Sequence, residues 1–175
     1  MAQLNQRKKN GVKWLLYIFS LFLAFILQTT VGCFQVFGVK PIFILPVMVY
    51  ISMFEGELAG AVIGIVGGLF WDTAADKLLG FNAIIMMVIC VSVALLVMYL
   101  VRVNVWNALL FVFAGALLQG LIDFFFYYLI WDYDYSYLIL LKKILPTVLY
   151  TTLISPLFFF IIRKISYTFS EVERI

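Results

Sequence analysis

Two aspartates in one predicted loop are the first residues in this sequence that could do chemistry. Asp72 and Asp76 lie four positions apart, and paired carboxylates can serve acid–base catalysis or bind a metal. The sequence has no histidine, which removes the commonest metal ligand and the usual proton shuttle. Aspartate just beyond a helix end is also a common cap or turn former. We therefore expect no catalytic residue, no cofactor and no metal here.

A third aspartate, Asp123, is predicted inside a membrane span, about 12 Å below the interface at 1.5 Å per residue. Gln119 lies four positions before it and shares its helix face. Two interpretations remain open. Asp123 could form an ion pair with Lys142 or Lys143 and fasten two helices together, or it could belong to an outward-facing polar pocket for a ligand or partner. The pocket candidates are Asp72, Gly80, Gln119 and Asp123.

Glycine recurs at every fourth position near the middle of the chain, at Gly56, Gly60, Gly64 and Gly68. On a helix such a row drifts by only about 40° per step, so it stays on one broad face. A face of small residues lets another helix approach backbone to backbone. The row could pack against a helix of the same chain, or it could form a dimer or partner interface.

The elements that carry these residues must be membrane helices, because 66% of the chain is hydrophobic and only 12% is charged. A soluble protein is about 25% charged. We predict an all-α polytopic membrane protein with six transmembrane helices in a single membrane domain of residues 14–164. Pro41 is expected to open the second helix and Pro46 to kink it. The predicted spans are residues 14–30, 41–54, 58–71, 83–101, 105–131 and 137–162.

The basic residues predict the orientation, because short loops rich in Lys and Arg stay in the cytoplasm. With six spans, both termini lie on one side of the membrane, as a basic segment of residues 1–13 and a tail of residues 165–175. That side carries Arg7, Lys8, Lys9, Lys13, Arg102, Arg163, Lys164 and Arg174. The other side carries Lys40, Lys77, Lys142 and Lys143. We expect both termini in the cytoplasm of a multi-pass cell-membrane protein.

The order of several short motifs resembles one known family. A basic N-terminus precedes a span that ends in Gln28, and later segments match in order and spacing. These segments are Lys40–Pro41, the run ELAGAVIGIVGGLFWD from Glu57 to Asp72, Leu79–Gly80, Leu121–Ile122–Asp123, and Pro156 followed by Arg163–Lys164. Together they resemble the MreD family of bacterial rod shape-determining membrane proteins.

This resemblance implies a scaffold of the elongation machinery in a bacterial inner or plasma membrane, and a protein that is not an enzyme. Its implied partners are an MreC-like single-span protein, RodA with its penicillin-binding transpeptidase, the MreB assembly and the lipid bilayer, with no nucleic acid and with homodimerisation left open. The fold is expected to be similar to the six-helix substrate-binding subunits of energy-coupling-factor vitamin transporters. The residues that match the family pattern are Gly60, Gly64, Gly68, Asp72, Gly80 and Asp123.

The alternative function is that of such a vitamin-transporter subunit. Those subunits usually carry an alanine-x-x-x-alanine face on an early helix, where they dock their coupling partner. The first predicted span of this chain contains only Ala24, which argues against the alternative. An intramembrane enzyme is a third interpretation, and the sequence has no nucleophile–base pair to support it.

Overall fold

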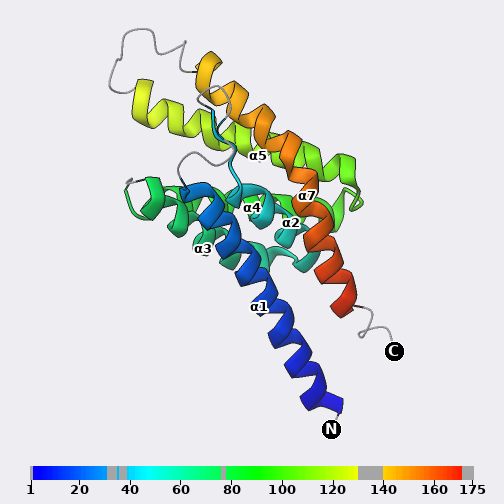
Figure 1. The fold of residues 1–175 in the computed structure, drawn as a ribbon. Coiled ribbons are helices and arrows are strands. Elements are labelled where there is room, and N and C mark those ends of the chain that lie inside the picture. The colour runs from blue at the N-terminus through cyan, green and yellow to red at the C-terminus, as the bar shows by residue number, and fades with distance from the viewer. Residues whose placement is uncertain (1, 31–34, 36–38, 76–77, 130–139, 171–175) are drawn as a thin grey trace.

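The computed structural model describes residues 2–30, 35, 39–75, 78–129 and 140–170, and these residues form a helical bundle (Figure 1). Two π-helical segments, η1 (Phe125–Leu129) and η2 (Leu140–Ile144), extend α5 and precede α7. The α-helices are α1 (Ala2–Thr29), α2 (Ile44–Glu55), α3 (Glu57–Ala75), α4 (Phe81–Tyr99), α5 (Val105–Phe124) and α7 (Leu145–Ser170).

Five helices of the described chain are long and apolar enough to cross a membrane. The shorter one, α2, has 12 residues and is about 18 Å long at 1.5 Å per residue. The hydrocarbon core of a bilayer is about 30 Å thick, so α2 alone does not cross it. Five of the six predicted spans thus correspond to helices of spanning length, and the predicted span of residues 41–54 corresponds to the shorter α2.

The first and last helices also extend beyond the predicted spans toward the two ends of the chain. α1 begins at Ala2 and α7 continues to Ser170, well beyond residues 14 and 162. Gln, Lys and Arg are good helix formers, so α1 can continue as a helix where its sequence becomes polar. The N-terminal end of α1 and the C-terminal end of α7 lie at the same end of the molecule (Figure 1).

The start of α2 differs from the prediction. Pro41 and Ile42 are not helical, and α2 begins at Ile44, three residues later than expected. Pro46 therefore falls in the first turn, where its missing N–H would have no helical partner anyway. The expected kink at Pro46 is wrong for this reason.

The centre of the bundle is α2, and the other helices surround it (Figure 1). Every residue from Ile44 to Met53 is buried. α2 contacts α1, α3, α4, α5 and α7. A helix that is apolar all round must be covered all round, and these five neighbours cover α2.

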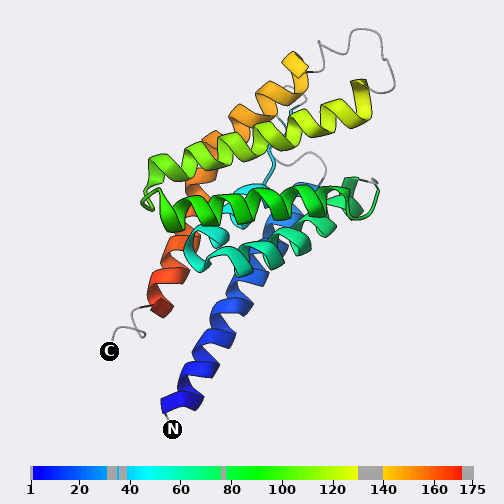
Figure 2. The same ribbon diagram turned by 180° about the vertical axis from the view of Figure 1, so that it is seen from behind.

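The glycine row brings α3 against α4, and the two helices run side by side (Figure 2). A Cβ atom added to Gly64 would lie 2.7 Å from the Met87 Cα atom, and one added to Gly68 would meet the backbone of Ala83. A Cβ atom on Gly60 would lie 3.2 Å from the Cys90 carbonyl oxygen. These three glycines therefore face the backbone of α4, which covers them from any second chain.

Gly56 does not share this role. Its φ angle is +89°, and the nearest atom to an added Cβ would be the Met98 Cε atom at 3.9 Å. A left-handed φ angle favours glycine, and this residue separates α2 from α3. Its place in the predicted packing row is corrected to a turn position.

The last helix, α7, packs against α5 and contains a proline in its interior, Pro156. Proline cannot donate to the carbonyl four residues earlier, which here belongs to Thr152. The Ser155 hydroxyl donates to that carbonyl oxygen at 2.8 Å. In a membrane such a bond replaces the missing backbone donor, so α7 continues through Pro156.

Candidate functional site

Asp72 caps the start of α4 from the end of α3. One carboxylate oxygen of Asp72 accepts a hydrogen bond from the Gly80 N–H at 2.8 Å. The other accepts bonds from the Asn82 N–H at 3.1 Å and from Asn82 Nδ2 at 2.8 Å. Gly80 is the N-cap residue, with φ +94° and no side chain of its own, so Asp72 supplies the acceptor that a capping side chain would provide. The negative charge also suits a helix N-terminus.

The same cluster continues from α4 to α5. The Gln119 Nε2 atom donates to the Asn82 Oδ1 atom at 3.3 Å and to the Asp123 Oδ2 atom at 2.8 Å. Asp72, Asn82 and Gln119 are each no more than 1% exposed. We call Asp72, Asn82, Gln119 and Asp123 the aspartate cluster. It joins α3, α4 and α5 through side chains that lie inside the bundle.

The structure brings the four predicted pocket candidates together, but their polar atoms bond to one another. Asp72 is buried and already accepts three hydrogen bonds, so its carboxylate holds the end of α3 to the start of α4. Lys142 and Lys143 are exposed on η2, and the described contact of Asp123 is with Gln119 instead of either lysine. Asp76 lies outside the described residues.

Sequence reasoning missed Asn82, which links the two halves of the aspartate cluster. Its signal is weak, because an asparagine two residues after a glycine is ordinary at a helix start. Its role depends on Gln119, which lies 37 positions further along the chain. Only the packing of α4 against α5 brings the two amides together.

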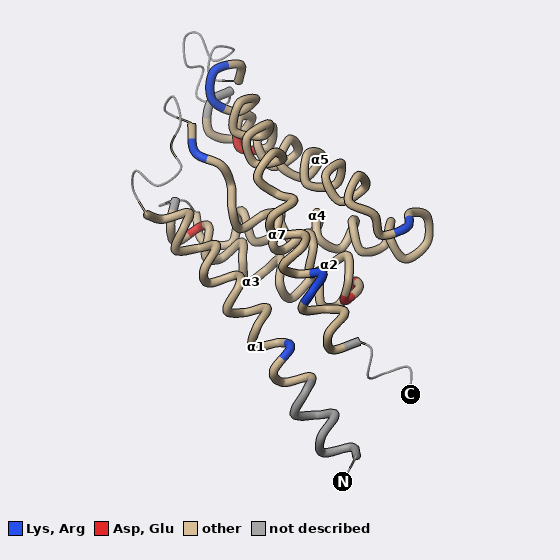
Figure 3. The backbone as a smooth tube through the Cα atoms, turned by 45° about the vertical axis from the view of Figure 1, so that its right-hand side comes forward, with Lys and Arg blue, Asp and Glu red and all other residues tan. Residues whose placement is uncertain are grey.

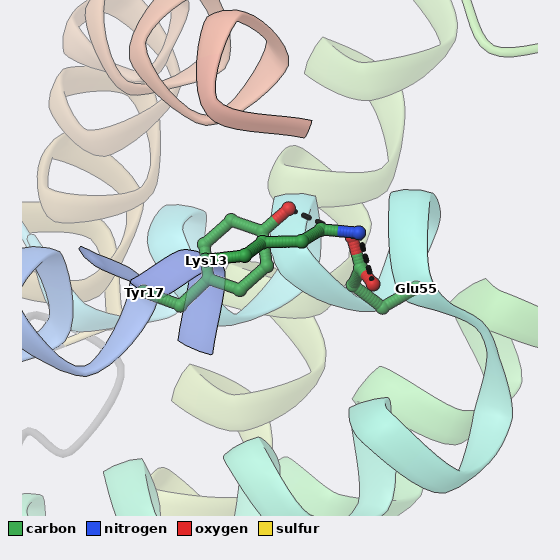
Figure 4. Close-up of polar contacts among 3 residues, drawn as sticks. All are labelled: Lys13, Tyr17 and Glu55. Atoms are coloured by element: carbon green, nitrogen blue, oxygen red, sulfur yellow. Dashed lines mark hydrogen bonds and ion pairs between the residues drawn. The ribbon is translucent and has the colours of Figure 1, made fainter. Parts of the chain in front are cut away.

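A second cluster fastens α1 to the end of α2 (Figure 4). The Lys13 Nζ atom lies 2.7 Å from Glu55 Oε1 and 2.8 Å from Glu55 Oε2. The Tyr17 hydroxyl donates to Glu55 Oε1 at 2.7 Å. The Lys13 and Glu55 side chains are 14% and 13% exposed, and Tyr17 is fully buried. We call Lys13, Tyr17 and Glu55 the Lys13 cluster, and it was not predicted from the sequence.

The opposite end of α2 is also held by α1. The Gln28 Oε1 atom accepts hydrogen bonds from the Phe43 N–H at 2.8 Å and the Ile44 N–H at 3.4 Å. Lys13 and Gln28 are 15 residues apart, or about 22 Å along α1, against about 18 Å for α2. One helix therefore carries polar side chains at the right separation to hold both ends of the other.

Charged residues gather toward the two ends of the bundle, with long uncharged stretches between them (Figure 3). The Lys13–Glu55 pair lies at one end, where Phe54 also contacts Tyr167 near Arg163. The aspartate cluster lies at the end of α3 and the start of α4, away from that pair. In the described ranges, no three Cys, Asp or Glu side chains come together as a metal site.

These features define a class of protein: a multi-pass membrane protein whose apolar helices are joined by buried polar clasps. A family model described as rod shape-determining protein MreD matches residues 8–168 of the chain. The chain belongs to the MreD family, so it has a role in rod-shape determination and lies in the bacterial cell membrane. No curated protein and no solved structure matches it. The comparisons give no support to the vitamin-transporter alternative.

Replacing Asp72 by asparagine is expected to destabilise the protein, because one carboxylate oxygen becomes an NH₂ donor. Each oxygen of Asp72 faces an N–H donor, so either orientation of the amide sets donor against donor. We expect a loss of about 1–3 kcal/mol of unfolding free energy, seen as a lower thermal midpoint in detergent. Thr73→Ala, at the next and exposed position, is the matched control and should stay near wild type. An unchanged midpoint for Asp72→Asn would refute the capping role.

A charge swap tests the Lys13 cluster. Lys13→Glu alone and Glu55→Lys alone should each lower the thermal midpoint, because like charges then meet at a half-enclosed site. The double variant Lys13→Glu/Glu55→Lys should recover part of the loss, since the pair is restored with its order reversed. Glu57→Lys serves as a control of equal charge change two residues away. Losses that simply add in the double variant would contradict a direct pairing.

Proposed function

We propose that this chain is a non-enzymatic scaffold of the rod-shape elongation complex. It binds an MreC-like single-span protein and regulates lateral peptidoglycan synthesis and cell shape. The observation that carries the proposal is the MreD family match over residues 8–168. The polar contacts of the described residues support it as well. Within each of the two clusters, the buried side chains bond to one another, and in the aspartate cluster also to backbone, which suits a rigid framework better than a reaction centre.

The partners act at two levels in this proposal. The MreC-like protein contacts the chain within the bilayer, where its single span meets lipid-facing helix surfaces. RodA, its penicillin-binding transpeptidase and the MreB assembly join directly or through that partner. A homodimer would have to use a face other than the row from Gly60 to Gly68, because α4 covers that row.

Topology is part of the same proposal: six membrane-embedded helical segments, both termini in the cytoplasm, and a fold similar to the vitamin-transporter subunits. The shared location of the ends of α1 and α7 supports it (Figure 1). So does the excess of basic residues predicted for that side, because such residues are retained in the cytoplasm.

Cysteine labelling tests this topology. Single cysteines in place of Arg102 and of Lys164 should resist a membrane-impermeant thiol reagent in intact cells and react after lysis. A cysteine in place of Lys142 is the matched control and should react before lysis. The native Cys33 and Cys90 are first replaced by serine and alanine. Reaction of the Arg102 and Lys142 positions from the same side would refute the arrangement.

Depletion tests the function. Loss of the protein from its rod-shaped host should give round cells, while uptake of vitamins stays normal. Affinity purification from mild detergent should bring down an MreC-like single-span protein. Rod shape retained after a clean deletion would contradict the proposal, and so would co-purification of transporter ATPase subunits in place of the MreC-like partner.

A further inference from the structure

The side chain of Arg163 on α7 lies over two aromatic rings. Its Cζ atom is 5.4 Å from the centre of the Tyr167 ring and 6.0 Å from the centre of the Phe159 ring. Arginine attracts ring faces through its charge and its flat shape. The guanidinium group is therefore held in place although Arg163 is exposed.

The aromatic rings beneath Arg163 are themselves fixed. Phe54, near the end of α2, lies 5.9 Å from Phe159 and 6.2 Å from Tyr167 between ring centres. Phe159 is 1% exposed, whereas Tyr167 is half exposed at 51%. The platform is thus anchored to the central helix on one side and open to the surroundings on the other.

Among the described residues, no carboxylate lies within ion-pair distance of Arg163. The one ion pair of these residues joins Lys13 to Glu55. Glu55 already receives bonds from Lys13 and Tyr17. A guanidinium group carries a planar fork of N–H donors, and two of them fit two oxygens of a phosphate. The exposed Lys164 adds a second positive charge beside it.

Apolar side chains lead away from Arg163 along the same helix. Phe160 lies three residues before it and so on the same side of α7, and it is 58% exposed. Leu157 lies a further three residues back and is 63% exposed. A cation followed by an exposed apolar strip matches the order of headgroup and acyl chain in a phospholipid. A free phosphate ion has no apolar part that could contact the strip.

We propose that Arg163, on its platform of Phe159 and Tyr167, is a binding site for the phosphate of an anionic phospholipid of the phosphatidylglycerol class. The acyl chain of that lipid runs along Phe160 and Leu157. The site lies at the end of the bundle where α1 begins and α7 ends (Figure 1). It fixes the depth of α7 in the bilayer. It is separate from the scaffold role, since any partner could be absent while the lipid binds.

Lipid binding by the purified full-length protein in detergent tests this site. Dioleoyl phosphatidylglycerol and dioleoyl phosphatidylcholine are titrated separately, and bound lipid is counted by native mass spectrometry. The wild type should prefer phosphatidylglycerol by about fivefold or more, the attraction expected of one cation at an anionic surface. Arg163→Gln should abolish this preference, while Arg163→Lys should keep less than half of it because lysine lacks the planar pair of donors.

Arg102→Gln is the matched control, because Arg102 is also exposed and basic, and no ring contact holds it among the described residues. It should keep the full preference. Equal losses for Arg163→Gln and Arg102→Gln would reduce the site to a diffuse basic surface and overturn the proposal. Displacement of the lipid by inorganic phosphate, at an ionic strength where chloride does not displace it, would make this a phosphate site and would also overturn the lipid assignment.

Discussion

A backbone N–H inside a bilayer has no water to bond, and this constraint is strongest where the chain enters α2. Residues 40–43 are not helical, although Pro41, Ile42 and Phe43 are buried. Irregular backbone is tolerated at such depth only where other protein groups satisfy it. The Thr151 hydroxyl accepts from the Ile42 N–H at 2.9 Å, and Gln28 takes the next two donors. α1 and α7 must therefore flank α2, and the rest of the bundle is arranged around that trio.

The polar clusters matter more for register than for net attraction. Lipid tails are as apolar as leucine, so apolar helices gain little from choosing one mutual alignment over another. A buried polar group with a single partner makes the alternatives costly, because a slip of one residue leaves it unsatisfied. The Lys13 cluster sets α1 against α2 in this way, and the aspartate cluster sets α3, α4 and α5. The glycines of α3 supply the close approach, and the polar side chains decide where along the helices it occurs.

Much of the helical framework could be predicted, because membrane helices show themselves as long apolar runs. The limits of α2 could not, since Gln28 and Thr151 lie 15 and 109 positions from their bonding partners. The spacing of the glycines predicts a close-packed face, but nothing local says that α4 occupies it. Glu55 and Asn82 were missed for the same reason, because their roles exist only once distant helices are packed. Asp72 and Gln119 stood out because polar residues among apolar ones are rare.

The charged groups at one end of the bundle hold helices together, whereas some of those at the other end are exposed and available for recognition. At the aspartate cluster the carboxylate of Asp72 is buried and accepts bonds from amides, so its charge is shielded from anything outside the protein. At the other end Glu55 is taken by Lys13, and this leaves the cations of Arg163 and Lys164 at the surface. A scaffold in a membrane can recognise neighbours only through what it exposes, namely apolar helix faces and charges near the headgroups. In the proposed function, partner proteins contact the apolar helix faces and lipid phosphates bind the charges, while the buried polar clusters hold these two surfaces in a fixed relation.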